Sequence, residues 1–173
     1  LRVEIAVVQA WGKAGVIPQN DVELISKNAK IHVPDIMQYI EETHHDVTAF
    51  LRSISDSLGS ESRWVHYGLT SNDVWDTATC LQWIETIDFL TSQSVDLRNV
   101  IMARAKEHKN TVCIGRTHGI HAEPTTFGLK LLVWVEELQR HIERLTLART
   151  QIAVGQMSGP VGTHASVPPS VES

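Results

Sequence analysis

Apolar residues recur at helical spacing along almost the whole chain, first in short segments. The first segment has an apolar face made of Val3, Val7, Ala10, Trp11 and Ala14, and Gly15 ends it. Further short helices are expected after Pro18, where Asn20 and Glu23 resemble a capping box, from Pro34, and from about Asp46 to Leu58. The first part of the chain therefore predicts a small set of short helices.

Two much longer helical patterns follow. Residues 71–114 contain neither glycine nor proline, and Ser71 or Asn72 can cap the helix that starts there. A helix of roughly 36 residues would be about 54 Å long at 1.5 Å per residue. A second apolar-periodic run covers residues 124–154, is interrupted only by Gly128, and is expected to start as a helix at Pro124. Alternating strand patterns are almost absent, so the expected class is all-α.

These lengths predict two domains. Residues 1–69 would form a small N-terminal helical domain, and residues 70–173 would form the first part of a central bundle of long helices. Helices of this length suit a long bundle, or an oligomer in which several chains share one bundle.

Composition limits the classes of partner. The 173 residues carry a net charge of −5 without a basic run, which argues against nucleic acid. No apolar run approaches the roughly 20 residues of a membrane span. Cys80 and Cys113 stand in no metal or redox spacing, which indicates a reducing compartment and predicts a cytoplasmic protein.

Polar residues gather in three clusters at the joints between expected helices. These are the segments Thr43–Asp46, His66–Asp73 and Gly115–Gly128. The third combines two histidines, an arginine, a glutamate and hydroxyls between glycines, ahead of a helix start that favours anions. Because histidine is well matched to proton transfer near neutral pH, this segment predicts an anion-binding, proton-transferring loop.

Each cluster also has a purely structural interpretation. Asp46 can be a helix N-cap beside two solvated histidines, and residues 70–72 can simply cap the first long helix. The glycines of the third loop can shape a turn that carries surface histidines. His118 and His121 are three residues apart and could bind a metal ion, but no third ligand set is visible.

The second and third clusters closely resemble two motifs of the adenylosuccinate lyase family, in the fumarase/aspartase superfamily. Further similarity lies in residues 45–47, 106–109 and 155–163, and the order is the same over essentially all of the chain. The resemblance implies a β-elimination that cleaves a C–N bond and releases fumarate. The implied substrates are adenylosuccinate, which gives AMP, and the succinyl-carboxamide ribotide of purine synthesis. It also implies a homo-oligomer, a tetramer in the full-length enzyme, without a metal or another cofactor.

The resemblance also assigns roles by motif position. His118 resembles the family's general acid, with His45 coupled to it. His66 resembles the histidine that reaches the substrate phosphate. The other expected substrate-binding residues are His44, Asp46, Thr70, Ser71 and Thr117, of which Thr70 and Ser71 would hold the succinyl carboxylates and Thr117 would flank the acid.

Two departures from the family pattern qualify these roles. Close relatives often carry arginine where this chain has His44, and histidine lacks the permanent charge and bidentate contact of arginine. The family's catalytic base is a serine in a Ser-Ser-x-Met-Pro-x-Lys-x-Asn signature, which does not occur in residues 1–173. We therefore expect the N-terminal part of a longer enzyme, inactive by itself.

Three other interpretations remain open on the sequence. The chain can belong to a sibling lyase with argininosuccinate, fumarate or aspartate chemistry. It can be a non-catalytic helical assembly module whose polar loops only cap helices. The third alternative, a metal-binding module, rests on the histidine spacing alone.

Overall fold

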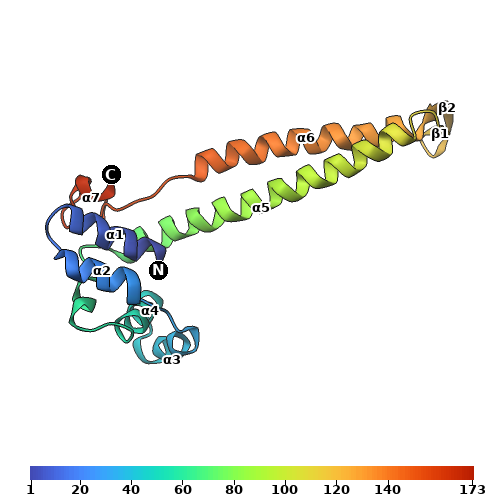
Figure 1. Cartoon of the computed structure of the whole chain (residues 1–173). Coiled ribbons are helices and arrows are strands. Elements are labelled where there is room, and N and C mark those ends of the chain that lie inside the picture. The colour runs from blue at the N-terminus through green and yellow to red at the C-terminus, as the bar shows by residue number, and fades with distance from the viewer. The chain divides into compact units, whose positions relative to one another are not determined.

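The computed structural model describes all 173 residues and is helical apart from one two-stranded hairpin (Figure 1). The chain divides into two compact units, residues 1–80 with 154–173 and residues 81–153. The first boundary between these units falls inside the first long helix. The expected domain boundary between residues 69 and 70 stays a prediction. The all-α class is confirmed.

The first unit contains the short helices and both chain ends. Its elements are α1 (Arg2–Lys13), α2 (Gln19–Asn28), α3 (Val33–Thr43), α4 (Asp46–Ser55), the 3-10 turn η1 (Ser60–Trp64), the start of α5 (Ser71–Glu107) and the short α7 (Pro169–Glu172). The expected apolar face of α1 is buried at Val3, Val7 and Trp11, whereas Ala14 is exposed. The Trp11 indole also donates a hydrogen bond of 3.0 Å to the carbonyl oxygen of Tyr67, which ties α1 to the segment before α5.

Two short helices differ in detail from the expectation. Pro18, not Asn20, is the N-cap of α2, and no side chain caps that helix. Helix α4 ends at Ser55 rather than near Leu58. The capping-box interpretation was wrong because the fixed φ of Pro18 already suits the residue before a helix, so the helix starts immediately after it.

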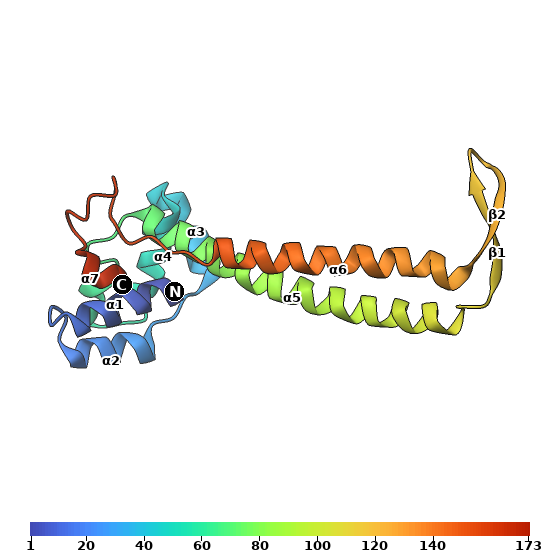
Figure 2. The same ribbon diagram turned by 90° about the horizontal axis from the view of Figure 1, so that it is seen from above.

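The second unit is built on two long antiparallel helices. Residues 81–107 of α5 run beside α6 (Phe127–Ile152), as both views show (Figure 2). The start of α5 at Ser71 and its length of 37 residues confirm the prediction for the first long helix. Between the two helices, Arg149 forms a two-pronged ion pair with Asp88 at 2.5 and 3.0 Å. Hydrogen bonding from the Arg149 guanidinium lowers the pKa of Asp88 below its usual value.

Both long helices leave large apolar side chains exposed. On α5 these include Trp83, Phe89, Leu97 and Val100, and on α6 they include Leu129, Val133, Trp134 and Leu147. Neither helix has the long apolar stretch that crossing a membrane requires. Exposed apolar area of this kind is typical of surfaces that other helices cover.

Gly128 is where the first turn of α6 passes the end of α5. Its N–H donates to the carbonyl oxygen of His108 at 3.0 Å. A Cβ atom at this position would lie 2.8 Å from Cα of Lys109 and 2.9 Å from the carbonyl carbon of His108. Both neighbours are backbone atoms, so they cannot move aside without displacing a helix end.

Replacing Gly128 by alanine is therefore expected to lower the free energy of unfolding by about 2–3 kcal/mol, as overpacking does in tight cores. Urea unfolding followed by circular dichroism measures the change. Gly155→Ala is the matched control, because the atom nearest to its Cβ would be a side-chain methyl carbon of Thr77 at 3.3 Å rather than a backbone atom. Equal stability of the two variants would contradict the close approach at Gly128.

Candidate active site

His118 lies at the tip of the hairpin formed by β1 (Val112–Thr117) and β2 (Ile120–Thr126). The turn has two residues, His118 and Gly119, with φ angles of 51° and 76°. Positive φ at both central positions defines the hairpin turn that best matches the twist of the strands. The His118 side chain is exposed and has no hydrogen-bond partner within the chain. Its ring is therefore free to contact a ligand.

The expected helix start at Pro124 is wrong. Pro124 lies in β2 opposite Ile114, and α6 begins at Phe127 after the N-cap Thr126, whose hydroxyl accepts a hydrogen bond from the N–H of Leu129. A proline fits here because the strand register shifts between Ile114 and Arg116, and a bulge does not need every N–H. The predicted loop is thus a two-stranded antiparallel hairpin.

Gly115 makes that bulge possible. A Cβ atom on it would come within 2.6 Å of the carbonyl oxygen of Glu123 on the facing strand. The sequence contained a signal for the hairpin, since His118-Gly119 is a positive-φ pair between residues of high strand propensity such as Thr117 and Ile120.

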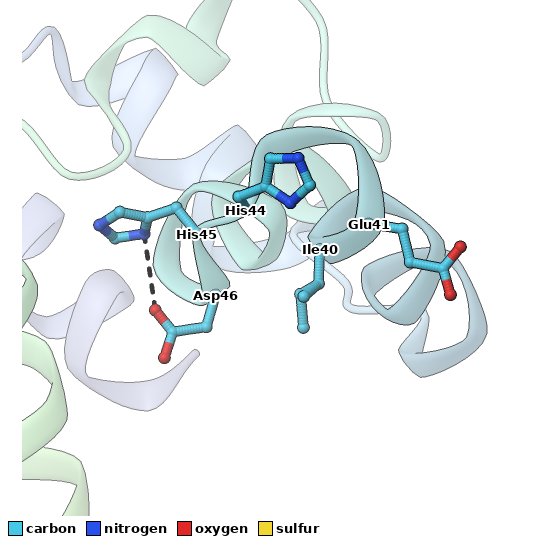
Figure 3. Close-up of a pocket in the computed structure, with 5 residues that line it drawn as sticks. All are labelled: Ile40, Glu41, His44, His45 and Asp46. Carbon is cyan, nitrogen blue, oxygen red and sulfur yellow. Dashed lines mark ion pairs between the residues drawn. The ribbon is translucent and has the colours of Figure 1, made fainter.

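His44, His45 and Asp46 form the joint between α3 and α4 and line an open cleft of about 710 Å³ with Ile40 and Glu41 (Figure 3). His44 ends α3 in the left-handed conformation, with φ of 53°. His45, not Asp46, is the N-cap of α4, and its Nδ1 accepts a hydrogen bond of 3.3 Å from the N–H of Thr48. The N-cap interpretation of Asp46 was wrong by one residue.

The helix cap restricts which hydrogen bonds the two ring nitrogens of His45 can make. Nδ1 also lies 3.5 Å from Oδ1 of Asp46, but one nitrogen cannot accept from Thr48 and donate to Asp46 at once. When Nδ1 caps the helix, a neutral ring carries its proton on Nε2, and the side chain is exposed to solvent.

His66 is fixed by a residue that the sequence analysis did not single out. Its Nδ1 lies 2.7 Å from Oε1 of Glu4, and its backbone N–H donates to Oε2 of the same carboxylate at 2.9 Å. Glu4 is on α1 and is almost completely buried. In the sequence it was an ordinary acidic residue in the first turn of a helix, so no signal marked it.

Thr70 directly precedes the long helix α5, which begins at Ser71, and Thr70 is held by Asp73. The fully buried carboxylate of Asp73 accepts from the N–H of Thr70 at 3.0 Å, which is the return half of a capping box. Both hydroxyl-bearing residues are half-buried. Their backbone is thereby held at the positive end of the helix dipole, a place that favours carboxylates.

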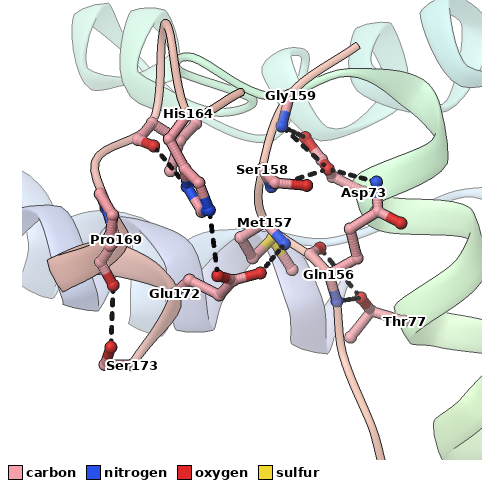
Figure 4. A network of polar contacts seen from close by, with 11 residues as sticks. Asp73, Thr77, Gln156, Met157, Ser158, Gly159, His164, Pro169, Glu172 and Ser173 are labelled. Atoms are coloured by element: carbon pink, nitrogen blue, oxygen red, sulfur yellow. Dashed lines mark hydrogen bonds and ion pairs between the residues drawn. The ribbon is translucent and has the colours of Figure 1, made fainter. Parts of the chain in front are cut away.

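Asp73 also holds the segment that follows α6 (Figure 4). Its carboxylate accepts hydrogen bonds from the N–H groups of Ser158 and Gly159 at 3.2–3.3 Å, while Thr77 exchanges hydrogen bonds with the backbone of Gln156. One buried carboxylate therefore joins two sequence motifs that are more than eighty residues apart. The sequence placed Asp73 inside a motif without indicating this role.

The predicted site residues fall in both units. The first unit holds His44, His45, Asp46, His66, Thr70 and Ser71, and the second unit holds Thr117 and His118. Within the first unit, an apolar cavity of about 300 Å³ lies between Asp46 and the first turns of α5 at Val74 and Trp75. No hydrogen bond links His66 to the histidines at positions 44 and 45. The structure contains no group of three or more side chains that could hold a metal ion.

A protein-family model described as lyase matches residues 1–173. This chain belongs to that lyase family. It is 49% identical over 172 residues to an adenylosuccinate lyase from Bacillus subtilis and 46% identical to one from Staphylococcus saprophyticus. Each alignment covers 99% of this chain and 40% of the relative, so the chain spans less than half the length of these relatives.

The lyase fold is also found among solved structures. A fumarate lyase from Mesorhizobium sp. BNC1 superposes with a TM-score of 0.91 at 28% identity, over 99% of this chain and 42% of that one. The similarity to lyases at both levels confirms the resemblance on which the sequence analysis relied. The roles assigned to single residues of this lyase chain stay predictions.

Proposed function

We propose that this chain is part of an adenylosuccinate lyase that releases fumarate from adenylosuccinate to give AMP. The observation that carries the proposal is the 49% identity to an adenylosuccinate lyase over nearly the whole chain. The same enzyme would act on the succinyl-carboxamide ribotide of purine synthesis, as the resemblance implies. It would work in the cytoplasm as a homotetramer, and the exposed apolar side chains of α5 and α6 support assembly with further helices.

In the proposed reaction a base removes a proton beside a succinyl carboxylate, the C–N bond breaks, and an acid protonates the leaving nitrogen. His118 is the proposed acid, and its exposed, unpartnered ring on a rigid turn supports that role. An imidazolium at this place would give its proton to the nitrogen as the bond electrons move to it. His45 would exchange protons with His118, and the serine base would come from outside residues 1–173.

The remaining proposed roles concern binding. His66 would contact the phosphate, while Thr70 and Ser71 would bind the succinyl carboxylates through hydroxyl and backbone donors. Thr117 would flank the acid. His44 and Asp46 would complete the open cleft beside α4.

A substrate panel on the full-length enzyme tests this proposal. Adenylosuccinate is expected to be cleaved much faster than argininosuccinate or aspartate, and faster than fumarate is hydrated. Preference for any of the other three compounds would assign the chain to a sibling lyase. The 173-residue chain alone is expected to be inactive, and substantial turnover by it would contradict the claim that the base lies elsewhere.

A further inference from the structure

Glu4 is a buried carboxylate whose two oxygens both bind one residue. Only 2% of Glu4 is exposed, and its partners are the ring nitrogen Nδ1 and the backbone N–H of His66. A buried carboxylate is costly unless charged or hydrogen-bonding groups compensate it. Here the compensation comes from a residue sixty-two positions later in the chain, at the edge of a proposed binding site.

This contact fixes the chemistry of the His66 ring. A carboxylate at 2.7 Å accepts a hydrogen bond, so the proton is held on Nδ1 and Nε2 faces away from Glu4. Nε2 has no hydrogen-bond partner in the chain, and it is not a buried atom.

The backbone at His66 is also held in place from α1. Its φ of 65° is left-handed, a conformation that costs a non-glycine residue about 1–2 kcal/mol. The bond from the His66 N–H to Glu4 and the bond from the Trp11 indole to the carbonyl oxygen of Tyr67 lie on either side of this strained position. Contacts from helix α1 therefore fix the backbone that carries the His66 ring.

We infer that Glu4 is a positioning residue, which binds Nδ1 of His66 and orients the ring so that Nε2, when it carries a proton, can donate a hydrogen bond to the substrate phosphate. This inference rests on the proposed function. It adds a residue from α1, outside every motif that the sequence analysis identified, to the machinery for substrate recognition.

The test uses the full-length enzyme with adenylosuccinate and with its analogue that lacks the 5′-phosphate. Glu4→Gln keeps the shape of the side chain but cannot accept both hydrogen bonds. It is expected to lower kcat/KM for adenylosuccinate roughly tenfold or more, about 1.4 kcal/mol, mainly through KM, because the ring that contacts the phosphate would no longer be held in one orientation. For the analogue without phosphate, kcat/KM should change by less than about twofold, because this substrate has no phosphate for His66 to bind.

A double-mutant cycle with His66→Ala separates positioning from general destabilisation. If Glu4 acts through His66, the double variant should lose no more than His66→Ala alone. Equal losses for both substrates, or losses that multiply in the double variant, would show a merely structural role and overturn the inference. Glu4→Asp keeps the negative charge and is the second variant if Glu4→Gln does not fold; it is expected to retain phosphate selectivity.

Glu172 supplies a matched control, because it also binds one backbone N–H and one histidine (Figure 4). Its Oε1 accepts from the N–H of Met157 at 3.0 Å, and its Oε2 lies 3.5 Å from Nε2 of His164. Glu172→Gln should affect both substrates alike. A wild-type enzyme that cleaves neither compound would contradict the proposed function and this inference together, whereas cleavage without a phosphate-specific effect of Glu4→Gln would contradict the inference alone.

Discussion

Replacing His118 by asparagine in the full-length enzyme is expected to lower kcat for adenylosuccinate by roughly 10²–10⁴, the range that general acid catalysis contributes. Asparagine tolerates positive φ, and Asn-Gly is a favoured pair for this two-residue turn. The variant therefore keeps the hairpin and removes the proton donor. KM should change little, because the acid acts on the leaving nitrogen rather than in ground-state binding.

His121→Ala is the control for this experiment. His121 is an exposed residue of the same hairpin and pairs with Arg116 across the two strands. It is expected to retain most of the activity. Near-wild-type activity of His118→Asn would refute the acid assignment, and equal losses in both variants would attribute the effect to the hairpin rather than to proton transfer.

Replacing Asp73 by alanine should lower the free energy of unfolding by about 3–5 kcal/mol, because each hydrogen bond to a charged group contributes about 1.5–3 kcal/mol. The carboxylate is fully buried and accepts from the N–H groups of Thr70, Ser158 and Gly159. It also lies in the first turn of α5, where the helix dipole stabilises negative charge. Removing it leaves the N–H of the buried Gly159 and those of two half-buried residues without an acceptor.

Thermal and urea unfolding measure this loss, with Asp76→Ala as the control. Asp76 is on the same helix but exposed, so its replacement should change stability by less than about 0.5 kcal/mol. Asp73→Asn keeps one acceptor oxygen and should fall between the two. Equal stability of Asp73→Ala and Asp76→Ala would contradict the role of this network.

The sequence predicted the helices well where apolar spacing was long and uninterrupted. The start and length of α5 followed from the absence of glycine and proline, and the apolar face of α1 followed from its period. The hairpin was missed because its two strands do not alternate regularly between apolar and polar residues, and because Pro124 resembles a helix start more than a strand residue. Its bulge depends on the close approach of Gly115 and Glu123, which local propensity does not report.

The candidate site residues could be predicted from the motifs, whereas the residues that hold them in place by hydrogen bonds could not. The ring of His66 is held by Glu4, sixty-two positions away, and nothing in the sequence spacing pairs these two residues. Asp73 joins residues that only the fold brings together. Long-range contacts of this kind arise from the packing of whole elements, so a pattern along the chain does not reveal them.

The identity of the products tests the proposed function most directly. Full-length enzyme incubated with adenylosuccinate should yield AMP and fumarate in equal amounts, as separated and quantified by chromatography. Adenylosuccinate that remains intact under conditions where the enzyme is folded, or products other than AMP and fumarate, would contradict the proposed function.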